Sequence, residues 1–190
     1  LLEGIEEIGE SAFAESGVSS IAFPEGLKVI EERAFQSCEE LKMFTMPSTL
    51  TTIGSRAFGS CSKLMSSTIN GADLSISGDL FYRCPNITGI TVGKDVRSLA
   101  FTEVIDKAIT EFSFEDGSQC TKIDGNAFGS SSKVTSLKLP DSLKEIGESV
   151  FSSCKISSLT LPEGLESIGK NAFNNKTSRE NLVAVTGGKN

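Results

Sequence analysis

The stretch VTSLKLPDSLKEIGESVFSSC, residues Val134–Cys154, returns along the chain in altered copies, such as LKMFTMPSTLTTIGSRAFGSC at Leu41–Cys61. Both follow the pattern L-x-x-I-x-L-P-x-x-L-x-x-I-G-x-x-A-F-x-x-C, with apolar exchanges. An Ile or Val stands five residues before a Phe at eight places: Ile8/Phe13, Ile30/Phe35, Ile53/Phe58, Ile76/Phe81, Val96/Phe101, Ile123/Phe128, Ile146/Phe151 and Ile168/Phe173. A recurring unit of about 23 residues predicts a solenoid.

Each unit begins with residues that alternate in character, as in Ser136–Leu139, which predicts a strand. A proline then ends the strand because it lacks an N–H and fixes φ, at Pro24, Pro47, Pro140 and Pro162. A second short extended piece follows, as in Leu143–Ile146. A glycine comes after its Ile at Gly9, Gly54, Gly147 and Gly169, where we expect a positive φ that turns the coil.

The apolar residues of one unit have nothing to pack on unless units stack. Stacking predicts one continuous core with a ladder of phenylalanines. It also predicts that each first strand pairs with its equivalent in the next coil, which gives a parallel sheet with strands about 4.8 Å apart. We therefore expect a mainly β repeat protein with about eight coils.

The middle repeats depart from the pattern. Ile87–Val96 is short and Phe101–Phe128 is long, and proline is missing at sites that we align as Asn70, Gly93 and Gly117. We favour drift in a tolerant loop. The alternative is that Phe101–Cys120 bulges from the solenoid and forms a local binding site, since loop insertions often carry function.

The pattern at Leu139–Cys154, and in close form at Met46–Cys61, resembles the BspA-like leucine-rich repeats, also described as the Treponema pallidum type. The resemblance implies a right-handed, horseshoe-like solenoid with its parallel sheet on the concave side. Members are known mostly from secreted or cell-surface proteins of bacteria and mucosal protozoan parasites, and several are regarded as adhesins. The shared motif consists of core positions, so the resemblance implies no functional residue.

The repeat uses nearly the whole chain, so we expect a single domain, residues 1–190, with a degenerate end at 174–190 that contains a candidate last strand, Leu182–Val185. The net charge of −7 argues against a nucleic-acid partner. No apolar run reaches the roughly 20 residues that span a bilayer. The chain starts inside a repeat without Met, and we expect targeting and anchoring segments to lie outside it.

The sequence contains no His, which removes the common catalytic triads and the commonest metal ligand. We therefore expect no catalytic residue, no cofactor and no metal. Four cysteines stand three residues after the repeat phenylalanine, namely Cys38, Cys61, Cys84 and Cys154, whereas Cys120 lies outside this register. Ser16 and Ser131 occupy the same position elsewhere, which predicts a small buried packing site. Reduced thiols are favoured, and a disulfide stays open.

Residues that flank the inward positions of the first strands should point outward. Most carry hydroxyl groups. We expect a partner to bind around six of them: Met43, Thr45, Thr68, Thr91, Glu111 and Lys138. A protein or a glycan would suit such a polar surface, but no aromatic residue stands in these columns, which weakens the glycan alternative.

The sequence thus predicts a non-catalytic protein-binding module. The resemblance implies that it acts like an adhesin, in a secreted or cell-surface protein that contacts a host extracellular or surface protein. An intracellular leucine-rich-repeat scaffold or regulator is the alternative. A hydrolase is the least favoured class, because His and a nucleophile context are both missing.

Overall fold

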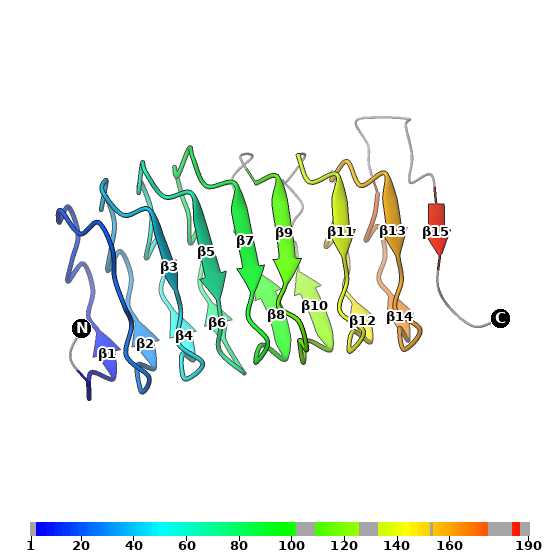
Figure 1. Ribbon diagram of the computed structural model, residues 1–190, viewed down its shortest axis with the longest axis horizontal. Helices are drawn as coiled ribbons and strands as arrows, with labels where there is room; N and C mark the ends of the chain where they lie inside the picture. The colour runs from blue at the N-terminus through cyan, green and yellow to red at the C-terminus, as the bar shows by residue number, and fades with distance from the viewer. Residues whose placement is uncertain (1–2, 102–108, 126–132, 153, 175–183, 187–190) are drawn as a thin grey trace.

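The computed structural model describes residues 3–101, 109–125, 133–152, 154–174 and 184–186, which form an elongated stack of coils (Figure 1). Its strands are β1 (Glu7–Ile8), β2 (Val29–Ile30), β3 (Met43–Thr45), β4 (Thr52–Ile53), β5 (Ser66–Ile69), β6 (Ser75–Ile76), β7 (Gly89–Val92), β8 (Ser98–Phe101), β9 (Glu111–Phe114), β10 (Lys122–Gly125), β11 (Ser136–Lys138), β12 (Glu145–Ile146), β13 (Ser158–Thr160), β14 (Ser167–Ile168) and β15 (Ala184–Thr186). Among these residues no helix is long and apolar enough to cross a membrane.

The strands form two parallel ladders along the stack. The first ladder has the order β3-β5-β7-β9 and then β11-β13-β15, and the second has β1-β2-β4-β6 and then β8-β10-β12-β14. Equivalent residues pair from coil to coil, for example Thr45 with Thr68 and Thr68 with Thr91. The predicted parallel sheet is confirmed. Among the described residues the second ladder has eight strands, which matches the number of coils that the sequence predicts. The second extended piece forms a ladder as well, which the sequence pattern did not indicate.

A phenylalanine ladder runs through the core, as predicted. The rings of Phe13, Phe35 and Phe58 stack with centroids 5.1 Å apart at each step, and Phe151 stacks on Phe173 at 5.2 Å. Phe44 of β3 adds a further ring at 4.0 Å from Phe58. Phe128 and the side chain of Phe101 lie outside the described residues. At these steps each ring covers its neighbour, and the buried residues of the described coils form one core cluster.

The repeat glycines do not have the positive φ that we expected for them. Positive φ falls instead on other residues of the turn, including Arg33, Ser37, Arg56 and Ser60. Their backbone N–H groups point along the stack, as in Arg33 N–H, which donates to Ser55 O at 3.0 Å, and Ser37 N–H, which donates to Gly59 O at 2.8 Å. The left-handed residues thus give the turns a third set of hydrogen bonds between coils.

The glycines serve close packing instead. A Cβ on Gly54 would lie 2.6 Å from the carbonyl carbon of Glu31, and one on Gly169 would lie 2.5 Å from that of Gly147. Real Cβ atoms do not approach other atoms this closely. Gly9, in the first coil, has no such neighbour within 4 Å. The coils can approach to strand spacing because these positions carry no side chain.

The middle coils lengthen the first ladder where proline is missing. Gly93 N–H donates to Ile69 O at 2.8 Å and Glu115 N–H donates to Val92 O at 2.9 Å, bonds that a proline cannot make. Accordingly β5, β7 and β9 have four residues, whereas β3, β11 and β13 have three. The register aligns Glu115 with Gly93, so our alignment of Gly117 with the missing proline was wrong by two residues.

The alternative of a bulge at Phe101–Cys120 is tested only in part, because residues 102–108 lie outside the described residues. Strand β9 stays in the first ladder, where it pairs with β7 along its whole length, so the chain does not leave the solenoid there. At the other end, the last strand is Ala184–Thr186, which pairs with β13. The candidate strand Leu182–Val185 overlaps β15 at Ala184 and Val185, and its first two residues lie outside the described part of the chain.

Candidate functional site

The outward wall consists of the first-ladder residues that point away from the core, from β3 to β11. All six predicted partner-binding residues lie on it. Met43, Thr45, Glu111 and Lys138 are exposed, and Met43 is the most exposed large apolar side chain, at 62%. Thr68 and Thr91, on β5 and β7, are half-buried. The structure therefore places these six residues on one surface that crosses five strands.

A row of hydroxyl groups runs along this wall. Thr45, Thr68, Thr91 and Ser113 occupy equivalent positions of β3, β5, β7 and β9. The hydroxyls of Thr91 and Ser113 lie 3.3 Å apart and hydrogen-bond to each other. Backbone pairing fixes the spacing of the row, which keeps its donors and acceptors in place before any partner arrives.

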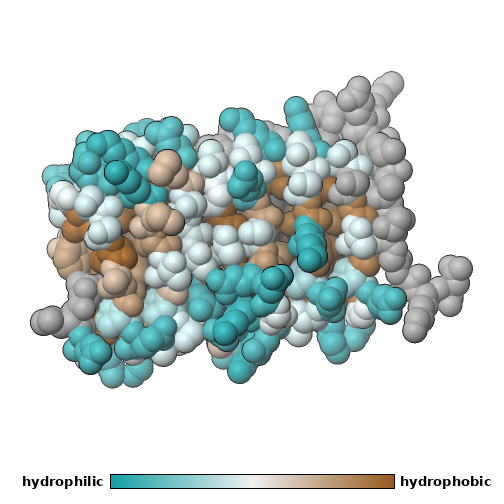
Figure 2. All heavy atoms as spheres, in the orientation of Figure 1, coloured by the Kyte–Doolittle hydropathy of each residue, from teal (hydrophilic) through white to brown (hydrophobic). Residues whose placement is uncertain are grey.

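The wall is poor in charge. In Figure 2 a white and brown band crosses the middle of the molecule, interrupted by a few hydrophilic residues, while most hydrophilic side chains gather above and below it. Glu111 and Lys138 are the two charged residues among the six predicted positions, and they stand on β9 and β11. A surface with few charges in its middle and more charges at its margin is typical of a protein-binding patch.

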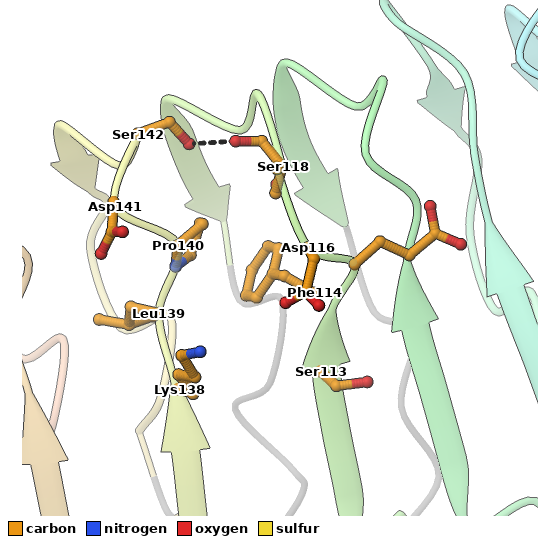
Figure 3. Close-up of a pocket in the computed structure, with 11 residues that line it drawn as sticks. Ser113, Phe114, Asp116, Ser118, Lys138, Leu139, Pro140, Asp141 and Ser142 are labelled. Atoms are coloured by element: carbon orange, nitrogen blue, oxygen red, sulfur yellow. Dashed lines mark hydrogen bonds between the residues drawn. The ribbon is translucent and has the colours of Figure 1, made fainter.

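The hydrogen-bonded ladder is interrupted between β9 and β11, which belong to separate sheets. A cleft with a volume of about 210 Å³ opens beside this interruption (Figure 3). Residues 113–118 line one side and residues 138–142 line the other. Ser142 closes one end, since its hydroxyl donates to Ser118 O and Cys120 O at 2.8 Å each. We call this feature the β9–β11 cleft.

The cleft has an apolar base and charged margins. Phe114, Leu139 and Pro140 supply the apolar surface, and the ring of Phe114 is fixed edge-on against Phe112 at 5.3 Å. Asp116, Asp141 and Lys138 are exposed at the margins. Within the described part of the chain these three form no ion pair. Glu115 also lines the cleft, but its carboxylate accepts a hydrogen bond from Lys94 N at 2.9 Å, toward the β7 side.

The sequence analysis identified Lys138 and the irregular segment, but it missed Phe114, Asp116, Pro140 and Asp141. These residues follow the ends of the strands, whereas the sequence analysis considered only the strand residues that flank inward positions. It therefore did not include them. The available signal was the missing proline before Asp116, together with the added length of Phe101–Phe128. Neither signal indicates that the hydrogen bonds between the strands of two successive coils, β9 and β11, are missing.

The profile of the BspA-type leucine-rich repeat region matches residues 1–104 and 99–186, with six copies of the repeat. The chain belongs to this family. The BspA-type assignment rests on nearly the whole chain and on the repeat spacing that the coils display. None of the curated protein sequences matches it.

Two solved structures of bacterial leucine-rich repeat proteins resemble this BspA-type solenoid. A leucine-rich repeat protein from Bacteroides ovatus is 25% identical over 90% of this chain and 50% of its own, with a TM-score of 0.62. The T. pallidum leucine-rich repeat protein is 23% identical over 68% of this chain and 60% of its own, with a TM-score of 0.51. The chain thus spans one half to three fifths of these relatives. Neither the family nor these structures indicates an enzyme.

The cysteines of the BspA-type coils are structural, as predicted from their position. All five are buried thiols. The thiols of Cys38, Cys61 and Cys84 donate to the carbonyl oxygen of the phenylalanine one coil earlier, at 3.1, 3.2 and 3.0 Å. A hydrogen bond with Cys84 and burial raise the pKa of Cys61, while burial raises the pKa of Cys120 to about 11 and that of Cys154 to about 12. The raised pKa keeps the thiols of Cys61, Cys120 and Cys154 protonated at neutral pH, and a protonated thiol is a poor nucleophile.

No metal centre is found in the part of the chain that the structure describes, where no three His, Cys, Asp or Glu side chains gather closely enough to hold an ion. The functional candidates that the geometry above supports are two surfaces: the outward wall and the β9–β11 cleft that continues it.

Proposed function

We propose that this BspA-type solenoid is a non-catalytic protein-binding module that binds its partner through the outward wall, in the manner of an adhesin. The observation that carries the proposal is the in-register row of exposed and half-buried hydroxyls on β3, β5, β7 and β9. Backbone hydrogen bonds hold this surface in one geometry. A rigid surface loses little conformational entropy when a partner docks, which favours binding.

Met43 supplies an apolar anchor beside this row. A large, exposed apolar side chain on a pre-organised surface is the kind of residue that contributes strongly to binding when a partner buries it. The wall lacks an exposed aromatic residue at the six predicted positions, which favours a protein over a glycan as the partner.

The extracellular setting rests on the family, whose resemblance implies secreted and cell-surface proteins and host proteins as partners. A second candidate, an intracellular scaffold that uses the same wall, is favoured by the state of the cysteines. All five are thiols, and thiols are typical of reducing compartments. Burial protects them from oxidants in either setting. The full-length gene separates the two candidates, since a signal peptide or a surface anchor supports the first.

A pull-down with three matched baits tests the proposal. The baits are the wild-type chain, Thr91→Arg on the outward wall and Thr52→Arg on the second ladder, where Thr52 is exposed on β4. Extracellular host proteins are offered to each bait. We expect the wild type and Thr52→Arg to capture the same protein, and Thr91→Arg to capture at least tenfold less, because the added side chain obstructs docking.

Thermal melting of the three baits is the control for folding, and we expect equal melting temperatures. A protein that is captured equally by Thr91→Arg, or that is lost with Thr52→Arg, contradicts binding through the outward wall.

A further inference from the structure

The β9–β11 cleft is the one place on the described outward wall where the surface is hollowed beside a break in the ladder. Elsewhere each described first-ladder strand is hydrogen-bonded to its neighbour, whereas β9 and β11 are not bonded to each other. The Ser142 hydroxyl fixes the width of the gap at one end through its two 2.8 Å hydrogen bonds to the facing coil. Hydrogen bonds therefore keep the cleft open in the folded protein, and the cleft is continuous with the proposed binding surface.

The size of the cleft limits its occupant to a single side chain. Its volume is about 210 Å³, which is smaller than the roughly 300–1,000 Å³ of pockets that hold a small molecule or cofactor. Its base is apolar, formed by Phe114, Leu139 and Pro140. A long side chain with an apolar stem and a polar end fits this arrangement, because the stem can cover the base while the end reaches the margin.

The charges at the margin of the cleft determine which polar group at the end of the bound side chain is favoured. Asp116 and Asp141 stand on facing sides of the opening, and both are exposed and unpaired within the described residues. Lys138 supplies one positive charge at the strand level, below the turns that carry the two carboxylates (Figure 3). The chain as a whole is also acidic, with a net charge of −7. A cationic group is therefore complementary to the margin of the cleft.

We propose that the β9–β11 cleft receives an arginine side chain of the protein partner. The inference rests on the proposed function and adds the chemistry that this part of the wall recognises. The methylene stem packs on Leu139 and Pro140, and the guanidinium plane lies against the ring of Phe114, which favours arginine over the more strongly hydrated lysine. Its N–H donors reach the carboxylates of Asp116 and Asp141.

The test uses N-acetyl-arginine amide as the probe and its citrulline analogue as the uncharged control of equal shape. Each is titrated into the whole chain, and backbone amide chemical shifts are followed by NMR. We expect saturable shifts at residues 113–118 and 138–142 with the arginine probe, and at least threefold weaker association with citrulline. Added salt should weaken the arginine response, since it screens exposed charges.

Matched variants assign the response to the two carboxylates. Asp116→Asn and Asp141→Asn should each weaken association about two- to fivefold, the range of exposed ion pairs. Glu163→Gln, which removes the same charge one coil beyond the cleft, should leave it unchanged. Lys138→Gln should strengthen it, because a competing positive charge is removed. All four residues are exposed, so we expect the variants to fold.

Three outcomes overturn the proposal: no saturable shift at these residues, an equal response to citrulline, or an unchanged response in both aspartate variants. Each of them leaves the pull-down with Thr91→Arg and Thr52→Arg standing, because those variants keep the cleft residues intact. Conversely, the pull-down can contradict binding through the outward wall while the arginine probe still binds. That result contradicts the proposed function and means that the cleft binds arginine without a role in that function.

Discussion

Single residues show how the coils reach strand spacing. Gly54 is packed so tightly that an added Cβ would lie 2.6 Å from Glu31 C and 2.8 Å from Glu32 Cα. These neighbours are backbone atoms of the preceding coil, so they cannot rotate away as a side chain would. Gly9 has the same place in the repeat but no atom within 4 Å, which makes it a natural control.

Replacing Gly54 by Ala should therefore separate two coils, and we expect the free energy of unfolding to fall by about 1–3 kcal/mol, as in other overpacked cores. Gly9→Ala should leave stability unchanged or raise it by about 0.4–1 kcal/mol, because alanine restricts the unfolded chain. Urea denaturation of both variants measures the difference. Equal effects at the two positions would contradict the packing role.

The sequence predicted which residues are buried better than it predicted why they are there. The phenylalanines and cysteines were identified as core positions because their spacing matches the repeat, and burial follows directly from stacking. The glycines were given the wrong role. The φ of each repeat glycine depends on the local path of the turn. The contact that excludes a side chain comes from the neighbouring coil, and the sequence of a single repeat does not reveal that contact.

At the scale of elements, the phenylalanine ladder joins one coil to the next. Phe58 has no exposed surface and touches rings on both sides, with Phe35 at 5.1 Å and Phe44 at 4.0 Å. Phe13, in the first coil, is half-buried and stacks on Phe35. The loss of stability when a phenylalanine is replaced by alanine should therefore increase with the number of ring faces that neighbouring rings cover.

We expect Phe58→Ala to lower the free energy of unfolding by about 3–5 kcal/mol, as for other fully buried aromatic residues. Phe13→Ala should cost clearly less, since part of its ring is already in water. Calorimetry and urea denaturation both measure this ranking. A Phe58→Ala protein that is as stable as the parent would show that the ladder does not hold the coils together.

The elements themselves followed from the sequence where the repeat is regular. Alternating residues gave the first strands, and the prolines gave their ends. The four-residue strands β5, β7 and β9 lack the proline, and an extra ladder hydrogen bond takes its place. The break between β9 and β11 could not be predicted, because hydrogen bonding between coils depends on how an irregular segment passes from one coil to the next.

The whole molecule has two unlike ladders. The second ladder and its flanks carry ion pairs between coils, such as Lys122 with Glu145 at 3.4 Å and Lys144 with Glu166 at 3.2 Å. Exposed pairs of this kind contribute about 0–1 kcal/mol each, so their main effect is a surface whose charges are already paired. The outward wall instead presents hydroxyls, Met43 and the charges of the cleft, which form no ion pair within the described residues. This asymmetry is why we assign partner binding to the first ladder.

Site-specific photo-crosslinking tests that assignment most directly. A benzophenone side chain is introduced in place of Thr91 on the outward wall or, in a second protein, in place of Thr52 on the second ladder, and each is irradiated with the captured partner. We predict a crosslinked product from position 91 and none from position 52. A product from position 52 alone would contradict the account and place the partner on the opposite ladder.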